Sequence, residues 1–146
     1  MKLTIQTIGK VGSKVTIDGH ELVFDQPASV PGGEDRGPSP LDVMSASVGA
    51  CAHYFAAAYL HGRGLSPAGL TVEVAAEKER VPLARIGRLE IRVQAPAGLS
   101  DRHLAGIARA IESCPAYGTL LSPPTVLISV DGRAVAGPAE PIAGVG

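Results

Sequence analysis

The 146-residue chain is poor in aromatic side chains: it has no tryptophan, two phenylalanines and three tyrosines. Its core must therefore be built from Ala, Val, Leu and Ile. A core with so few large side chains is thin for a monomer of this size. The composition therefore points towards burial against a second subunit.

An excess of charge of either sign is also missing. Thirteen Lys and Arg residues face fourteen Asp and Glu residues, which leaves a formal net charge of -1 at pH 7. This balance offers no electrostatic attraction for nucleic acid or an anionic membrane, so we predict neither as a partner. With 45% hydrophobic and 18% charged residues, the sequence is typical of one globular domain.

The N-terminal segment lacks the apolar region of a signal peptide, because Met1 to Lys10 alternates between apolar and polar residues. We therefore expect a cytoplasmic protein. The one long apolar run, Val43 to Leu60, is rich in Ala, Ser and Gly and contains His53. Sheet-like patterns flank this run on both sides, so we interpret it as a buried central helix and not as a membrane span.

Hydrophobic periodicity predicts a single α+β domain over residues 1–146 with the order βββ-α-ββ-α-β. The expected strands are Lys2 to Ile8, Lys14 to Ile17, Glu21 to Phe24, Leu70 to Glu79, Arg85 to Ala95 and a last, buried strand from Thr125 to Val130, with Asp18-Gly19 and RVPLAR as turns. Residues 1–37 form the N-terminal meander and a loop, residues 38–133 the core, and residues 134–146 a loose tail.

Two helices are predicted from their capping residues. Ser39, Pro40 and Asp42 supply an N-cap hydroxyl, a first-turn proline and a first-turn carboxylate, so the central helix should run from there to about His61 and stop at Gly62 or Gly64. Ser100-Asp101 caps the second helix, which should end at Cys114-Pro115. Its expected inward stripe is Leu104, Ile107, Ala108 and Ile111.

One of the two cysteines lies within the central helix. Helical spacing places Cys51 on one face with four apolar residues, namely Met44, Val48, Phe55 and Ala58. Burial alone raises the pKa of such a thiol and makes it inert, and the helix N-terminus is about three turns away. A reactive Cys51 therefore needs a neighbouring cation, for which Arg36, Lys10, Lys14 and the arginines of the predicted hairpin are candidates. The alternative is a small packed hydrophobe.

Cys114 precedes Pro115 at the end of the second helix. It either terminates that helix or begins a fresh turn at its N-cap, where free backbone amides make a sulfur ionise more easily. The cysteines are 63 positions apart, so they form no C-x-x-C motif, and no histidine stands at metal-ligand spacing from them.

Three segments together resemble the OsmC/Ohr family: GPSPLDVMSASVGAC, LTVEV and LAGIARAIESCPAYGTLL. The apolar third residue of the motif GPSPLD is closer to the less-characterised OsmC-like branch than to typical Ohr proteins. The resemblance implies an α+β fold with two long central helices packed with antiparallel sheets in an intertwined homodimer. It also implies a peroxidase of the oxidative stress response that reduces organic hydroperoxides, without a bound cofactor or metal and with an external dithiol as electron donor.

The resemblance further assigns the two sulfurs. Cys51 is the peroxidatic nucleophile, and Cys114 is the resolving thiol that captures the sulfenic acid as a disulfide. Peroxidase members carry a Glu early in the central helix that holds the catalytic Arg, and Leu41 stands at that position here. We therefore take Arg36 as the candidate thiolate activator and Glu34 as its candidate orienter, with Asp42 as the other carboxylate nearby.

Two further positions differ from the family pattern. The family's arginine usually comes from the N-terminal strands, where this chain has Lys10 and Lys14, and Tyr117 stands where many members have His. A second function is therefore kept open: a non-enzymatic OsmC-like dimer that binds a small apolar ligand between its helices. Cys51 is then only a packed residue.

Overall fold

The computed structural model describes residues 3–80 and 84–136. In chain order the elements are β1 (Leu3–Ile8), β2 (Gly12–Ile17), β3 (His20–Phe24), α1 (Pro40–His61), β4 (Thr71–Glu79), β5 (Arg85–Gln94), α2 (Asp101–Glu112), α3 (Pro115–Leu121), β6 (Ile128–Val130) and β7 (Arg133–Ala136). This is the α+β fold that the sequence predicts. The predictions for Lys2, for positions 81–83 of the RVPLAR turn and for the tail from 137 onwards lie outside the described residues.

The N-terminal strands form an antiparallel meander in the order β1-β2-β3. Asp18 and Gly19 connect β2 to β3, and both have a positive φ, 47° and 87°. That backbone conformation is the one a two-residue hairpin turn needs and explains the Asp-Gly pair. The predicted meander is confirmed, although β2 begins at Gly12, two residues before the expected start.

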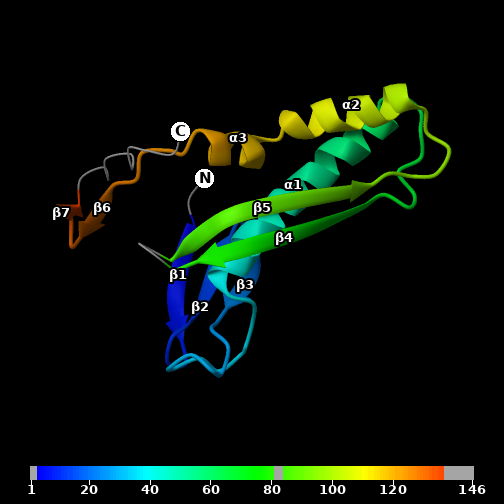
Figure 1. Ribbon diagram of the computed structural model, residues 1–146. Helices are drawn as coiled ribbons and strands as arrows, with labels where there is room; N and C mark the ends of the chain where they lie inside the picture. The colour runs from blue at the N-terminus through cyan, green and yellow to red at the C-terminus, as the bar shows by residue number, and fades with distance from the viewer. Residues whose placement is uncertain (1–2, 81–83, 137–146) are drawn as a thin grey trace.

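The β4–β5 hairpin runs beside α1, as Figure 1 shows. Val72, Val74 and Ala76 of β4 alternate with exposed residues and are half-buried, which is the pattern of a strand with one covered face. The register shifts near the end where the two strands are connected, since Glu77 pairs with Arg88 but Lys78 pairs with Ile86. The residue between these two partners is therefore the extra one of a β-bulge.

The helices α1 and α2 pack against each other over the start of β4. The buried cluster between them consists of Ala56, Leu60, Leu70 and Ile107. The α1 N-terminus has the predicted cap, because the Ser39 hydroxyl accepts a hydrogen bond from the Asp42 backbone N–H. The helix ends at His61 with Gly62 as its C-cap, also as predicted.

The helix faces are only partly those that we predicted. In α1 the buried residues are Ser45, Val48, Gly49, Ala52, Ala56 and Leu60, whereas Met44 and Ala58 of the predicted stripe are exposed. The reason is that the β4–β5 hairpin and α2 cover α1 from the side of Ala52, which leaves the predicted stripe at the edge of the packed face. In α2, Ile107 is buried, but Leu104 and Ala108 are exposed.

The prediction of a last, buried strand from Thr125 to Val130 is wrong. The strand β6 is short, its residues are exposed, and it pairs with β7 through a turn in which Asp131 and Gly132 have positive φ. Figure 1 shows this local hairpin away from the α1–α2 pair, beyond α3, which itself contacts α1 and α2. The segment β7, which begins at Arg133, was assigned almost entirely to the predicted loose tail.

By length and composition, α1 is also apolar enough to cross a membrane, with a mean hydropathy of 1.2 in its most apolar window. Core helices of soluble proteins pass the same test. In the described residues α1 contacts α2, α3, β4 and β5. It is thus the helix against which α2, α3 and the β4–β5 hairpin are packed.

Candidate active site

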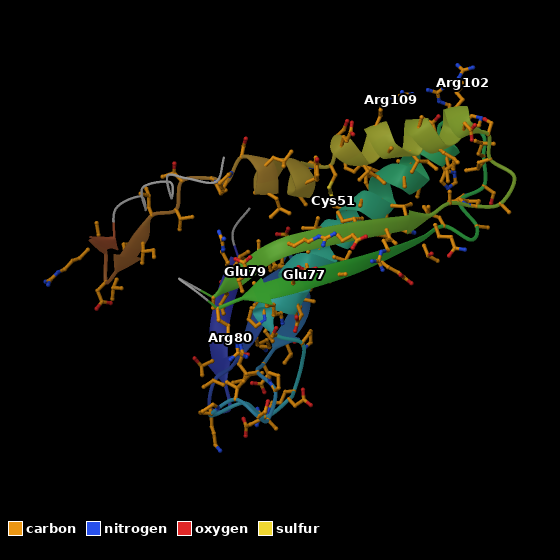
Figure 2. All side chains as sticks on the ribbon, in the orientation of Figure 1. Cys51, Glu77, Glu79, Arg80, Arg102 and Arg109 are labelled. Atoms are coloured by element: carbon orange, nitrogen blue, oxygen red, sulfur yellow. A yellow bond between two sulfur atoms is a disulfide. The ribbon has the colours of Figure 1, made fainter. Side chains whose placement is uncertain are left out.

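The two cysteines form a disulfide that joins the middle of α1 to the start of α3. Their Cα atoms lie 6.1 Å apart, within the range that a disulfide spans. Cys114 is 1% exposed and Cys51 is half-buried. Figure 2 shows Cys51 midway along α1, beneath the junction of α2 and α3. The structure therefore brings together the two residues that the sequence predicted to react with each other.

The chain turns at Cys114 because α2 cannot continue through Pro115. The N–H of Cys114 donates to the carbonyl of Ile111 at 2.9 Å and closes α2, and the N–H of Gly118 donates to the carbonyl of Cys114 at 3.0 Å and opens α3. Cys114 is thus the N-cap of a new helix. This is the second of the two alternatives that the sequence left open.

Two apolar cavities adjoin α3. One, of about 460 Å³, lies between α1, β5 and α3, and its lining includes Leu41, Met44, Val48 and Leu120. The other, of about 490 Å³, lies between β5, α2 and α3, and its lining includes Ile107, Ile111 and Tyr117. Leu41 and Tyr117, which differ from the family pattern, therefore both line apolar cavities near the cysteines.

The predicted pair of Arg36 and Glu34 is formed. Arg36 Nη2 lies 3.1 Å from Glu34 Oε2, and the same carboxylate oxygen accepts a hydrogen bond from the Lys10 backbone N–H at 3.4 Å. Gly9 suits this contact, because its φ of 59° favours glycine and a Cβ there would displace the ends of the Glu34 and Arg36 side chains. Three of the predicted polar residues thus meet at the β1–β2 turn, in what we call the Arg36 cluster (Lys10, Glu34 and Arg36).

Asp25 is a polar residue of this region that the sequence analysis missed. Its side chain is buried, and its carboxylate accepts backbone hydrogen bonds from Gln26 at 2.7 Å, Glu34 at 3.3 Å and Arg36 at 3.2 Å. Burial by itself raises the pKa of Asp25, but these three N–H groups and the Arg36 charge together hold it below its ordinary value of 3.8. An Asp directly after a strand and before a Pro/Gly-rich loop is the signal that indicates such a role.

Within one chain, the Arg36 cluster does not lie beside Cys51. The loop that carries Glu34 and Arg36 lies at the N-terminal end of α1, next to the β1–β2 turn (Figure 1). Cys51 is twelve residues beyond Ser39, the N-cap of α1, which corresponds to about 18 Å along the helix axis. The structure thus pairs Arg36 with Glu34 as predicted, but it places this pair away from Cys51 of the same chain.

Several of the other predicted charged candidates have partners of their own, including the hairpin residues Arg85, which pairs with Glu79, and Arg88, which pairs with Glu77. Lys14 pairs with Glu21 at 2.9 Å on the meander. Asp42 binds Lys78 at 2.6 Å, and this hydrogen bond, followed by one from Ser39, lowers the pKa of Asp42. Asp42 therefore fastens the start of α1 to β4 and does not hold Arg36. Over residues 3–80 and 84–136, no three His, Cys, Asp or Glu side chains gather as metal ligands.

The comparison with protein families decides the affiliation of the chain. The family described as OsmC-like protein matches residues 32–129, about two-thirds of the chain, and this range includes both cysteines. The chain belongs to the OsmC-like protein family. The resemblance inferred from the sequence is thereby confirmed. No curated protein matches this OsmC-like chain significantly by sequence.

Solved structures support the OsmC-like fold. A protein from Psychrobacter arcticus, described as an osmotic stress induced and detoxification response protein, aligns with a TM-score of 0.73 and 18% identity, covering 82% of this chain and 87% of that one. An OsmC-like protein from Mycoplasma pneumoniae gives 0.72 and 16%, covering 84% and 87%. The organic hydroperoxide resistance protein OhrB of Bacillus subtilis gives 0.56 and 19%, covering 81% and 88%. At these identities, the likeness is one of fold.

Proposed function

We propose that the protein is a cytoplasmic thiol-dependent peroxidase that reduces organic hydroperoxides. The observation that carries the proposal is the Cys51–Cys114 disulfide within one chain, which is the product expected when two thiols reduce a peroxide in succession. In cytosolic proteins, disulfides are usually transient and catalytic. The name of the similarly folded OhrB of Bacillus subtilis supports the substrate class.

The reaction proceeds in two steps. The Cys51 thiolate attacks one peroxide oxygen, the O–O bond breaks, and the departing alkoxide takes up a proton and leaves as an alcohol. Cys51 then carries a sulfenic acid. The Cys114 thiolate attacks this sulfur, the S–O bond breaks, and hydroxide leaves with a proton as water. A dithiol donor must afterwards reduce the resulting disulfide.

The apolar cavity beside α1 supports an organic substrate over hydrogen peroxide. Met44 and Val48 line this cavity and lie about two turns and one turn before Cys51 on the same helix. A hydrocarbon substituent placed against these side chains would leave water, whereas hydrogen peroxide has no apolar surface to bury. The cavity therefore favours hydroperoxides with an apolar body.

We further propose that the working unit is a homodimer in which the Arg36 cluster of one chain lies beside Cys51 of the other. Large apolar side chains are exposed on the meander and on the segment from α3 to β6; among the most exposed are Ile5, Leu121, Val126, Leu127 and Ile128. Exposed apolar groups in such number are typical of surfaces that pack against another protein. A guanidinium brought to Cys51 in this way would stabilise both the thiolate and the departing oxygen.

The decisive experiment is peroxide turnover. The wild type and Cys51→Ser are supplied with tert-butyl hydroperoxide and a dithiol reductant, and consumption of the peroxide is followed. We expect the variant to lose activity by at least about a thousandfold, because no other group replaces the nucleophile. Equal rates for the two proteins would overturn the peroxidase proposal.

The two apolar cavities favour a second candidate function, the binding of a small apolar ligand without catalysis. An apolar fluorescent probe separates the two functions, because a binding protein takes up the probe and shows no Cys51-dependent peroxide turnover. Saturable binding that is equal in the wild type and Cys51→Ser, together with absent turnover, is the result expected of such a protein.

A further inference from the structure

The two cysteines of the disulfide differ in how far they are buried. The Cys114 side chain is among the largest that are fully buried, whereas Cys51 on α1 is only half-buried. Thiol–disulfide exchange depends on which sulfur a thiolate can reach, and the attacking sulfur must approach roughly in line with the bond that breaks. Because Cys51 is more exposed than Cys114, an external thiol reaches Cys51 more easily than Cys114.

Attack on Cys114 would have to come from the side opposite Cys51, through the junction of α2 and α3. The backbone of this junction is fixed on both sides of Cys114 by the hydrogen bonds to Ile111 and from Gly118. Ile111 and Tyr117, three residues before and three after Cys114, line the apolar cavity at this junction. A thiol could reach this side of the sulfur only after local opening of the junction, which costs free energy.

We propose that the reducing thiol attacks Cys51, so that Cys51 carries the mixed disulfide with the donor and Cys114 is the leaving thiol. This proposal rests on the proposed function in two respects: peroxide reduction is what forms the disulfide, and the peroxide and the donor thiol approach Cys51 from the same side. A hydroperoxide must reach Cys51 from its exposed side, and the donor thiol follows the same path after the alcohol has left.

The steps balance with a dithiol as the reductant. One donor thiolate attacks Cys51, a new S–S bond forms, the bond between Cys51 and Cys114 breaks, and Cys114 leaves as a thiolate. The second donor thiol, once deprotonated, attacks the donor sulfur of this mixed disulfide. The donor is thereby oxidised to its own disulfide, and Cys51 is released as the thiolate that the next peroxide needs.

The test maps the first adduct. Full-length protein is oxidised with diamide, exposed briefly to 2-mercaptoethanol, quenched with acid, alkylated with N-ethylmaleimide and digested for mass spectrometry. We expect mercaptoethanol on Cys51 and N-ethylmaleimide on Cys114, at least about tenfold in excess over the reverse pattern at early times. In the reduced single variants, Cys51 of Cys114→Ser should also react with Ellman's reagent at least about tenfold faster than Cys114 of Cys51→Ser.

Each other outcome counts against the proposal. Mercaptoethanol found mainly on Cys114, or equally on both cysteines, would overturn it, and so would oxidised protein that contains no intramolecular disulfide. The proposed function fails by a different measurement, namely the absence of peroxide turnover. Because diamide forms the disulfide without any peroxide, the mapping result stands whichever way the turnover experiment ends.

Discussion

The carboxylate of Asp25 accepts a hydrogen bond from the backbone N–H of Arg36 at 3.2 Å and holds the loop before α1 against the end of β3. The same carboxylate binds the N–H of Glu34, so one buried side chain fixes both residues of the predicted activating pair. Their side chains then meet at 3.1 Å above Gly9. The position of the Arg36 cluster is thus set by Asp25, a residue outside the cluster.

The first prediction concerns Asp25→Asn and pH. The folded protein holds the pKa of Asp25 below its ordinary value of 3.8. Its contribution to stability is therefore complete above that value and is lost as the pH falls through the folded pKa. We expect the variant to be less stable than the wild type at neutral pH, with a difference that shrinks as the pH falls below 3.8 and through the lower pKa of folded Asp25. Urea unfolding across this range measures the effect, and a difference independent of pH would contradict it.

The second prediction concerns the Arg36 cluster. In a Cys114→Ser background, Arg36→Gln should slow iodoacetamide alkylation of Cys51 at about pH 6, because less thiolate is present. With both cysteines intact, it should lower kcat/KM for tert-butyl hydroperoxide about a hundredfold. Arg36→Lys should recover only part of the loss, because an ammonium lacks the guanidinium fork.

A matched control for this prediction is Lys14→Gln. Lys14 lies on β2 of the neighbouring meander and is also a cation, but its ammonium pairs with Glu21. Its loss should leave both the alkylation rate and kcat/KM unchanged. If Lys14→Gln and Arg36→Gln had the same effect, a general change of charge would explain it, and Arg36 would have no specific role.

The third prediction concerns Cys114→Ser under peroxide. Without the resolving thiol, the Cys51 sulfenic acid persists and can be oxidised further to the sulfinic acid. We expect about one equivalent of peroxide to be consumed rapidly and little turnover afterwards. Mass spectrometry should then find sulfinic acid on Cys51 of this variant and a disulfide in the wild type. Sustained turnover at the wild-type rate would show that Cys114 does not resolve the intermediate.

The fourth prediction concerns two helical glycines. A Cβ on Gly49 of α1 would lie 2.5 Å from Val74 Cγ2 of β4. Alanine favours the helix by up to about 1 kcal/mol over glycine, but overpacking costs about 1–3 kcal/mol, so we expect Gly49→Ala to destabilise the protein. Gly118→Ala in α3 is the control, because a Cβ there meets nothing within 4 Å. It should stabilise the protein by about 0.5–1 kcal/mol, as measured by urea unfolding.

The fifth prediction concerns assembly. Light scattering should give a mass of twice the 14.9 kDa of the chain. Leu127 is 77% exposed in the single chain, so Leu127→Ser should weaken the dimer if this segment packs against the second copy. We expect the dissociation constant to rise at least about tenfold, as loss of a buried leucine implies. A wild-type monomer would exclude the trans arrangement of the Arg36 cluster.

Local signals predicted most of the elements. The Asp18-Gly19 turn, the Ser39 cap and the alternation through Val72 and Val74 each depend on neighbours within a few residues, and each is found where expected. The segment after α3 differs from its prediction because an apolar run is not buried merely by being apolar. Asp131-Gly132 is the same kind of hairpin signal as Asp18-Gly19, but the apolar run before it was interpreted as a buried strand.

Local signals and the family resemblance were enough to predict the α+β order, the cap that starts α1 and the pairing of the two cysteines, because capping and turn chemistry depend on neighbouring residues and the resemblance covers both thiols. Three features emerge only from the folded chain: the buried face of α1, the attachment of the loop with Glu34 and Arg36 to Asp25, and the enclosure of Cys114 but not of Cys51. These features depend on which segments, distant in sequence, pack against a given side chain, and helical or strand periodicity carries no information about that choice.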